Sequence, residues 1–243
     1  MLRVEVAGSG VVLHSSGAAY LPEHQTLLIA DAHFGKAVSF RQLGVPVPEA
    51  TTGANLDQLT RTVGETGAQA IVFLGDFLHS RRSHAAQTMA SLAAWREQHH
   101  QLALTLVRGN HDDRAGDPPT DLGIVVVDEP LRMGGFALCH YPTPVPHAYV
   151  LAGHWHPCIS VKGRAFERLR LPCFWFGDDT GALPGNAVGV LPAFGSFTGM
   201  HPIRREVGDP VYEVADDLVM ALEGHRTAGT RDAPEAGGAG RST

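Results

Sequence analysis

Five short clusters of metal-ligand side chains occur along this chain, and most of them follow a run of apolar residues directly. Side chains from five separate segments can act together only if the fold brings the ends of those runs to one place. The clusters, in chain order, are Asp31-Ala32-His33, Gly75-Asp76, Gly109-Asn110-His111-Asp112, His140 and Gly153-His154-Trp155-His156.

The apolar runs are typical of buried β-strands, because they are short, continuous and rich in Val, Ile and Leu. They cover residues 27–30, 70–74, 103–107, 136–139 and 149–152. In an open α/β sheet, ligands bind beyond the carboxyl ends of the strands. We therefore expect the five clusters to lie together at one edge.

Helical patterns separate the first strands. Residues 48–66 and 83–99 both repeat apolar residues at helical spacing, and Ser83 is the expected N-cap of the second helix. Strands that alternate with helices predict βαβ units. The later part of the chain is richer in strands, which predicts a second sheet packed on the first.

The bulk composition limits the class of protein. A chain of 243 residues that is 44% hydrophobic can form a full α/β core. We expect one domain over residues 1–223 and a disordered tail over 224–243, where large apolar residues are almost absent. The chain has no apolar run of about 18 residues, so we expect no membrane span. The first residues do not resemble a signal peptide, so a cytoplasmic location is expected.

Two further counts exclude other kinds of site. Three cysteines without a CxxC pattern argue against a disulfide framework or a thiolate metal site. The net charge of -6 argues against a protein that coats nucleic acid through bulk electrostatics. A nuclease remains compatible with that charge, because two divalent cations would add about four positive charges where a phosphate sits.

The residue types predict a site for two metal ions. Asp31, His33 and further Asp and His ligands can hold one cation. Asn110 and two more histidines can hold a second if one carboxylate bridges both ions. Asp76 suits the bridge because a carboxylate has two oxygens. Two cations roughly 3.5–4 Å apart clamp a phosphoryl group and generate a hydroxide between them.

Spacing within the motifs supports this prediction. Asp31 and His33 would point to the same face if they alternate along a strand end. His154 and His156 can reach two neighbouring ions from an extended loop. Each motif taken alone also fits an ordinary turn or a structural histidine, and it is the ordered set of five that favours a metal centre.

His111 is the candidate catalytic acid. It lies beside the predicted metal ligands and can donate a proton to a leaving oxygen. Asp112 is expected to orient His111, in the way that carboxylates orient histidines around metal sites.

The set D-x-H, G-D, G-N-H-D, H and G-H-x-H resembles the calcineurin-like metallophosphoesterase superfamily over residues 31–156. The resemblance implies an α/β fold, a four-layer sandwich of two mixed β-sheets flanked by helices. It also implies that one ion is held by Asp31, His33, Asp76 and His156, and the other by Asp76, Asn110, His140 and His154.

The second motif narrows the resemblance. It lacks the later Asp and Arg of the protein phosphatase motif G-D-x-x-D-R-G, and its G-D-x-x-H form resembles the nuclease subunits of double-strand-break repair complexes. That likeness would place His79 near the scissile phosphate. Arg81 and Arg82 follow directly and are the candidate contacts to substrate phosphates.

Residues 171–175 and 191–199 resemble the bacterial ligase-associated DNA-damage-response phosphoesterases. This implies hydrolysis of DNA phosphodiesters in repair or end processing, in association with a DNA ligase and a helicase or nuclease. It also favours Mn²⁺, while the mixed oxygen and nitrogen ligands equally suit Zn²⁺ or Fe. Two alternatives stay open: a phosphodiesterase for small or cyclic nucleotides, and a non-catalytic scaffold with the same fold.

Overall fold

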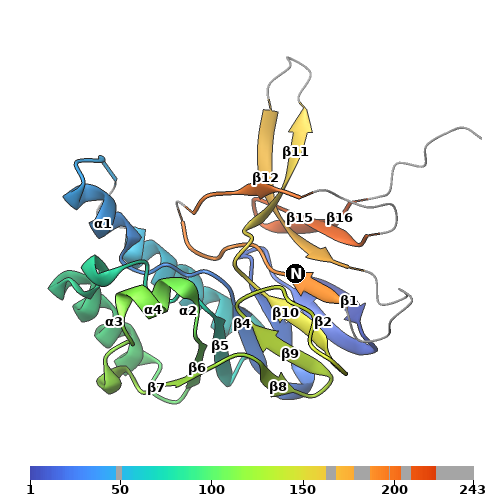
Figure 1. Ribbon diagram of the computed structural model, residues 1–243, viewed down its shortest axis with the longest axis horizontal. Coiled ribbons are helices and arrows are strands. Elements are labelled where there is room, and N and C mark those ends of the chain that lie inside the picture. The colour runs from blue at the N-terminus through green and yellow to red at the C-terminus, as the bar shows by residue number, and fades with distance from the viewer. Residues whose placement is uncertain (48–50, 163–167, 178–186, 197, 204–208, 223–243) are drawn as a thin grey trace, which may run out of the picture.

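The structure is a computed structural model and describes residues 1–47, 51–162, 168–177, 187–196, 198–203 and 209–222. The predicted tail, residues 224–243, lies outside the described residues, so its disorder and the domain boundary stay predictions. The described part is a layer of helices, a first β-sheet and a second β-sheet, in that order (Figure 1).

The first sheet has seven strands in chain order from β1 to β7. Neighbours from β1 to β4 are antiparallel, and neighbours from β4 to β7 are parallel. The strands are β1 Leu2–Val6, β2 Ser9–Leu13, β3 Ala19–Leu21, β4 Thr26–Ile29, β5 Ala70–Leu74, β6 Ala103–Val107 and β7 Ile124–Val127. Both faces of β4 and β5 are covered, which is why the two strands are apolar except at Thr26.

The described helices lie in the segments that connect the strands of the first sheet. The α-helices are α1 Lys36–Gln42, α2 Thr51–Thr66, α3 Ala86–Gln98 and α4 Asn110–Ala115, and the 3₁₀ turns are η1 Pro22–His24, η2 Arg81–His84 and η3 Thr120–Leu122. In the core, α2 and α3 bury Leu59 and Leu92 against residues of β4, β5 and β6. This confirms both predicted helices. None of the described helices is both long enough and apolar enough to cross a membrane.

The second sheet has nine strands. Seven follow the order β14-β11-β12-β13-β10-β9-β8, while β15 pairs with both β12 and β16. The strands are β8 Leu131–Met133, β9 Phe136–Cys139, β10 Tyr149–Ala152, β11 Pro157–Lys162, β12 Arg168–Phe176, β13 Val188–Val190, β14 His201–Pro202, β15 Val211–Ala215 and β16 Leu218–Ala221. Parallel and antiparallel pairs occur in both sheets, so the expected α/β fold with two mixed sheets is confirmed. The described residues form three of the four expected layers, because every described helix lies in a connection between strands of the first sheet.

The two sheets share one apolar core. Leu28 and Val72 project from the first sheet, and Leu138 and Leu151 project from the second. Burying side chains of this size contributes about 1.5–3 kcal/mol each. The three cysteines are buried and free.

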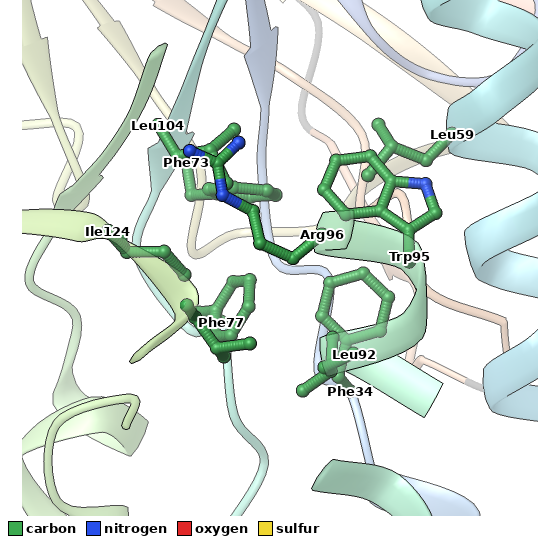
Figure 2. A pocket seen from close by; sticks show the side chains of 10 residues that line it. Phe34, Leu59, Phe73, Phe77, Leu92, Trp95, Arg96, Leu104 and Ile124 are labelled. Carbon is green, nitrogen blue, oxygen red and sulfur yellow. The ribbon is translucent and has the colours of Figure 1, made fainter. Parts of the chain in front are cut away.

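The core beneath the helices is closely filled. Its cavity measures about 10 Å³ and is lined by Phe34, Phe73, Phe77, Trp95 and further apolar residues, with Arg96 lying across it (Figure 2). The Arg96 guanidinium donates to the backbone carbonyls of His99 and Leu102 (2.8 and 2.9 Å). A space of this size and polarity holds no more than about one water molecule. The cavity is therefore a packing defect.

The prediction that Ser83 caps the second helix is wrong. Ser83 lies in η2, and α3 begins after Ala85 without a side-chain cap. The Ser83 hydroxyl instead accepts a hydrogen bond from the backbone N–H of Ser80 (3.2 Å). A Ser followed by a helical pattern looks the same in sequence whether a 3₁₀ turn precedes the helix or not.

Candidate metal centre

The seven predicted metal-ligand side chains lie in one cluster at the carboxyl ends of the strands. β4, β5 and β6 deliver Asp31, His33, Asp76 and Asn110 from the first sheet, while β9 and β10 deliver His140, His154 and His156 from the second. Ligand atoms of Asp31, His33 and His156 lie within 4.8 Å of one another, and so do those of Asp31, Asp76 and His140. The convergence that the sequence predicts is present in the fold.

Asp31 forms the centre of one half of the cluster. Its side chain is fully buried, and its Oδ2 accepts a hydrogen bond from the backbone N–H of His154 (2.8 Å). Its Oδ1 has no hydrogen-bond partner and lies 3.4 Å from Nε2 of His156. A buried carboxylate oxygen without a partner is costly unless a cation compensates it.

Asp76 lies between both halves. Its Oδ2 is 3.8 Å from Nε2 of His33, and its Oδ1 is 3.6 Å from Nε2 of His140. Oδ1 also accepts the backbone N–H of His111 (2.9 Å). Burial raises the pKa of Asp76 above its usual value. This position, reached from both halves, is the one that the bridging prediction requires.

The other half of the cluster is held by His140. Its Nδ1 is 3.0 Å from the backbone carbonyl oxygen of Leu74. A carbonyl only accepts, so Nδ1 donates to it and Nε2 is the ring nitrogen that faces the other ligands. That nitrogen lies 3.0 Å from Oδ1 of Asn110 and 3.0 Å from Nδ1 of His154.

The donor atoms therefore fit divalent cations. Nδ1 of His156 lies 2.9 Å from the carbonyl oxygen of Gly199, which again leaves Nε2 to face a carboxylate. Burial lowers the pKa of His33 far below its usual value, so its ring is neutral, the form that binds metal. Carboxylate oxygens and imidazole nitrogens, which are donor types that divalent cations bind, meet here in both halves.

The motifs reach the centre through backbone geometry that the sequence does not reveal. Asp31 and His33 do not alternate along a strand end as predicted. They follow β4 in the left-handed region, with φ of 52° and 46°. His154 and His156 also have positive φ, 68° and 44°. Such conformations are uncommon outside glycine, and they cluster at functional sites.

Asp112 has a different role from the expected one. Its carboxylate does not contact the ring of His111. Instead it accepts the backbone N–H groups of Asp76 (2.7 Å), Gly109 (3.0 Å) and Leu78 (3.2 Å). Burial raises the pKa of Asp112 to about 6, although these hydrogen bonds oppose the shift. Asp112 joins the loops that follow β5 and β6.

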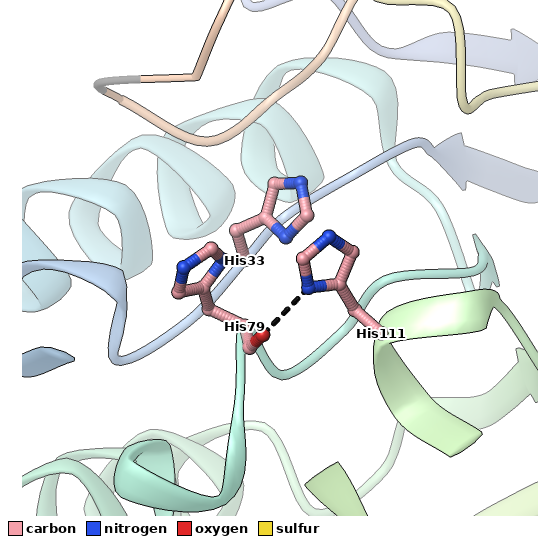
Figure 3. A group of neighbouring side chains, drawn as sticks. All are labelled: His33, His79 and His111. Carbon is pink, nitrogen blue, oxygen red and sulfur yellow. Dashed lines mark hydrogen bonds between the residues drawn. The ribbon is translucent and has the colours of Figure 1, made fainter. Parts of the chain in front are cut away.

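His79 takes over the orienting role, through its backbone. Nδ1 of His111 donates to the carbonyl oxygen of His79 (2.6 Å), as Figure 3 shows. The two rings are stacked with centroids 5.0 Å apart, and both lie close to His33. Nε2 of His111 is thereby directed toward Asp76, 3.9 Å from its Oδ2. Burial lowers the pKa of the His79 ring to about 4.

The predicted phosphate contacts are less well placed. Nε of Arg81 donates to the backbone carbonyl of Arg114 (3.1 Å), so this guanidinium is engaged over α4. Arg82 is exposed in η2. Their contact with substrate stays a prediction.

Glu129, which no sequence pattern indicates, positions His140, the first motif of the second sheet. Its Oε2 accepts the backbone N–H groups of His140 (2.7 Å) and Tyr141 (3.0 Å). Glu129 precedes a proline in a loop and has no pattern of its own, so no sequence signal points to it.

Close packing explains the glycine that precedes Asp76. Gly75 has φ of 78°, and a Cβ at this position would overlap the ring of His140. Gly109 is similarly confined, since a Cβ there would lie 2.5 Å from Oδ1 of Asp76. The ligands of one motif occupy the space that a side chain of the neighbouring motif would need.

The Gly75→Ala variant is expected to lose about 1–3 kcal/mol of unfolding free energy, and also to lose bound metal, because His140 must move. Thermal unfolding and metal analysis of the purified protein measure both effects. Gly64→Ala is the matched control, because Gly64 lies inside α2 with nothing near its Cβ position. Retention of the full metal content by Gly75→Ala would contradict this account of the packing.

Oxygen and nitrogen ligands gathered from two sheets, without a thiolate, define a class of protein. This donor set is typical of metal-dependent hydrolases, among them the phosphoesterases. A structure of nuclease MPE from Pseudomonas putida is similar to this chain, with 39% sequence identity and a TM-score of 0.78. The match covers 91% of this chain and 99% of that one. The chain belongs to the calcineurin-like metallophosphoesterase superfamily.

Two further structures are more distant. The phosphoesterase Yfce from E. coli has 15% identity and a TM-score of 0.35, with 80% of this chain and 90% of that chain covered. A predicted phosphoesterase from Streptococcus pneumoniae has 14% identity and a TM-score of 0.29, with 79% and 83% covered. No family model and no curated protein matches the chain.

Proposed function

We propose that this phosphoesterase is a two-metal phosphodiesterase that cleaves DNA. The observation that carries the proposal is the position of Asp76, whose two oxygens face the two halves of one buried ligand cluster. The similar structure from P. putida is named a nuclease, which favours a nucleic acid as the substrate.

The residues fit a division of labour. Asp31, His33, Asp76 and His156 would hold one ion, and Asp76, Asn110, His140 and His154 would hold the other. When bound, the ions supply charge that stabilises the phosphoryl group and activates water for in-line attack. His111, held by the His79 carbonyl, donates a proton to the leaving oxygen from Nε2. Asp112 keeps the loops that carry Asp76 and His111 in register.

Exposed aromatic rings beside the cluster support a substrate with nucleobases. Trp155 lies between two proposed ligands, is 44% exposed, and stacks on Trp175 with centroids 5.8 Å apart. Tyr141 is 38% exposed and lies 4.6 Å from the ring of His154. Bases stack on such surfaces with little dependence on sequence.

These rings also suit a phosphodiesterase for small or cyclic nucleotides, which is the second candidate. A non-catalytic scaffold with this fold is disfavoured, because the full set of predicted ligands and His111 are gathered in one site.

Three substrates separate the candidates. With Mn²⁺, we expect hydrolysis of bis-p-nitrophenyl phosphate and of nicked or 3′-blocked DNA, and loss of both activities when the metal is chelated. Turnover limited to cyclic nucleotides would reject the DNA assignment. Turnover of none of them with Mn²⁺, Zn²⁺ or Fe would favour the scaffold.

The biological setting is part of the same proposal. We infer a role in DNA repair or end processing, with Mn²⁺ as the preferred ion and with a DNA ligase and a helicase or nuclease as functional partners in the cytoplasm. The family resemblance supports this setting. If a DNA ligase could seal none of the cleavage products, either directly or after end repair, the proposed role in DNA repair would be contradicted.

A further inference from the structure

The chain is unusually poor in lysine. Of its 19 basic Lys and Arg residues only Lys36 and Lys162 are lysines, and Lys36 follows the first metal motif by three positions. None of the sequence patterns singles it out, because an isolated lysine is normally a solvated surface residue.

Local structure keeps the backbone of Lys36 next to the first metal motif. The preceding residue, Gly35, has φ of 77°, and a Cβ there would lie 2.6 Å from Cβ of Ser83. This tight turn begins α1 at Lys36, whose backbone N–H donates to the carbonyl of His33 (3.1 Å). The lysine therefore leaves the same short loop that carries Asp31 and His33.

The ammonium group continues a row of stacked rings. Nζ of Lys36 lies 5.9 Å from the centroid of Phe40. Phe40 is stacked on His79, with centroids 6.1 Å apart and an interplanar angle of 15°, and His79 is stacked on His111. Lys36 is thus placed at the side of the centre where the candidate catalytic acid lies.

The positive charge of Lys36 influences the titratable groups of the centre, but no carboxylate among the described residues forms an ion pair with it. Burial lowers the pKa of Lys36, and the charges of Asp31 and Asp76 oppose that shift. After burial, the charge of Lys36 is the largest influence that lowers the pKa of both His33 and His79. Among the described residues, Lys36 forms no ion pair with a carboxylate.

A half-buried cation beside a site for two divalent cations is electrostatically unfavourable until an anion lies between them. The substrate phosphate is such an anion. Lysine is a common phosphate ligand, which acts as a point charge with three donors. Arg81, the neighbouring candidate, is already bonded to the carbonyl of Arg114.

We propose that the ammonium group of Lys36 binds a non-bridging oxygen of the phosphodiester that is cleaved. This inference rests on the phosphodiesterase activity proposed above, but it does not require the substrate to be DNA. Lys36 is then a substrate-binding residue.

The test uses Lys36→Gln and Lys36→Arg in the full chain, with Lys162→Gln as the matched control that removes the same charge from β11. Loss of a charge-assisted hydrogen bond to the substrate is expected to lower kcat/KM of Lys36→Gln by about 10- to 100-fold. The loss should be equal for bis-p-nitrophenyl phosphate and for DNA, because both present the cleaved phosphate. Lys36→Arg should recover most of the activity, and Lys162→Gln should match the parent.

Binding of inorganic phosphate gives a readout that needs no turnover. Calorimetry on the Mn²⁺-loaded protein should show about 10-fold or greater weakening for Lys36→Gln, with unchanged metal content and thermal unfolding. A loss confined to DNA would overturn the assignment, since it would place Lys36 on a flanking phosphate. Parent-like phosphate binding and activity would also overturn it. Failure of the parent to cut DNA would reject the DNA proposal and leave this test intact.

Discussion

The Asp76→Asn variant is expected to lose phosphoesterase activity by about 10³-fold or more in kcat/KM, because metal ions supply several kcal/mol of transition-state stabilisation and each 1.36 kcal/mol is tenfold. Asp76 is the only predicted ligand assigned to both ions. Asparagine preserves its size and can still accept the N–H of His111. It removes the charge and the second anionic oxygen, so metal analysis should show a content below two ions for each chain.

The same variant separates function from stability. Burial, helped by the charge of Asp31, raises the pKa of Asp76, so the ionised carboxylate is held in an unfavourable place when metal is absent. We therefore expect metal-free Asp76→Asn to unfold at the same temperature as the parent or at a higher one. Asp57→Asn makes the same change on the exposed face of α2 and serves as the control. Activity within tenfold of the parent would exclude Asp76 as the bridging ligand.

Most of the frame around this site could be predicted from the sequence. An apolar run of four or five residues that is followed by a polar motif usually forms a buried strand. Such strands end at a shared edge, where their polar motifs can meet. The strands β4, β5, β6, β9 and β10 all appear within one or two residues of the predicted runs. Parallel pairing then brings the candidate ligands together within each sheet, and the packing of the second sheet on the first joins the two groups.

The local geometry could not be predicted in the same way. A D-x-H motif has the same letters in an extended strand and in a loop with left-handed backbone, and the fold uses the loop for Asp31 and His33. Ser83 is likewise ambiguous between an N-cap and a 3₁₀ turn. These choices depend on tertiary partners, such as the hydrogen bond from the His33 N–H to the Asp76 carbonyl (2.8 Å).

The contacts that support the site could not be predicted from the sequence either, because they join residues far apart in the chain. Glu129 holds the backbone at His140, and the carbonyl of His79, rather than Asp112, holds the ring of His111. Backbone carbonyls carry no residue signature, and any residue at position 79 would provide one. Residue identity therefore predicts which side chains do chemistry better than it predicts what orients them.

Replacing His111 by alanine is expected to lower DNA cleavage by about 10²- to 10⁴-fold, the usual contribution of a positioned general acid. The ring is held by the His79 carbonyl, and its side chain is 30% exposed, so a leaving oxygen can reach Nε2. The seven proposed ligands are untouched by this change, so the metal content should remain that of the parent.

The leaving group distinguishes proton donation from a purely electrostatic role of His111. Nitrophenolate leaves without protonation near neutral pH, whereas the alkoxide of a deoxyribose needs a proton. A general acid at His111 therefore predicts a much smaller loss with bis-p-nitrophenyl phosphate than with DNA, while His100→Ala, an exposed residue after α3, should match the parent on both. Equal losses on both substrates would assign His111 to charge stabilisation of the phosphoryl group. Unchanged activity on DNA would show that the proton comes from elsewhere, and the stacked His79 would then lose its proposed function as the group that orients the acid.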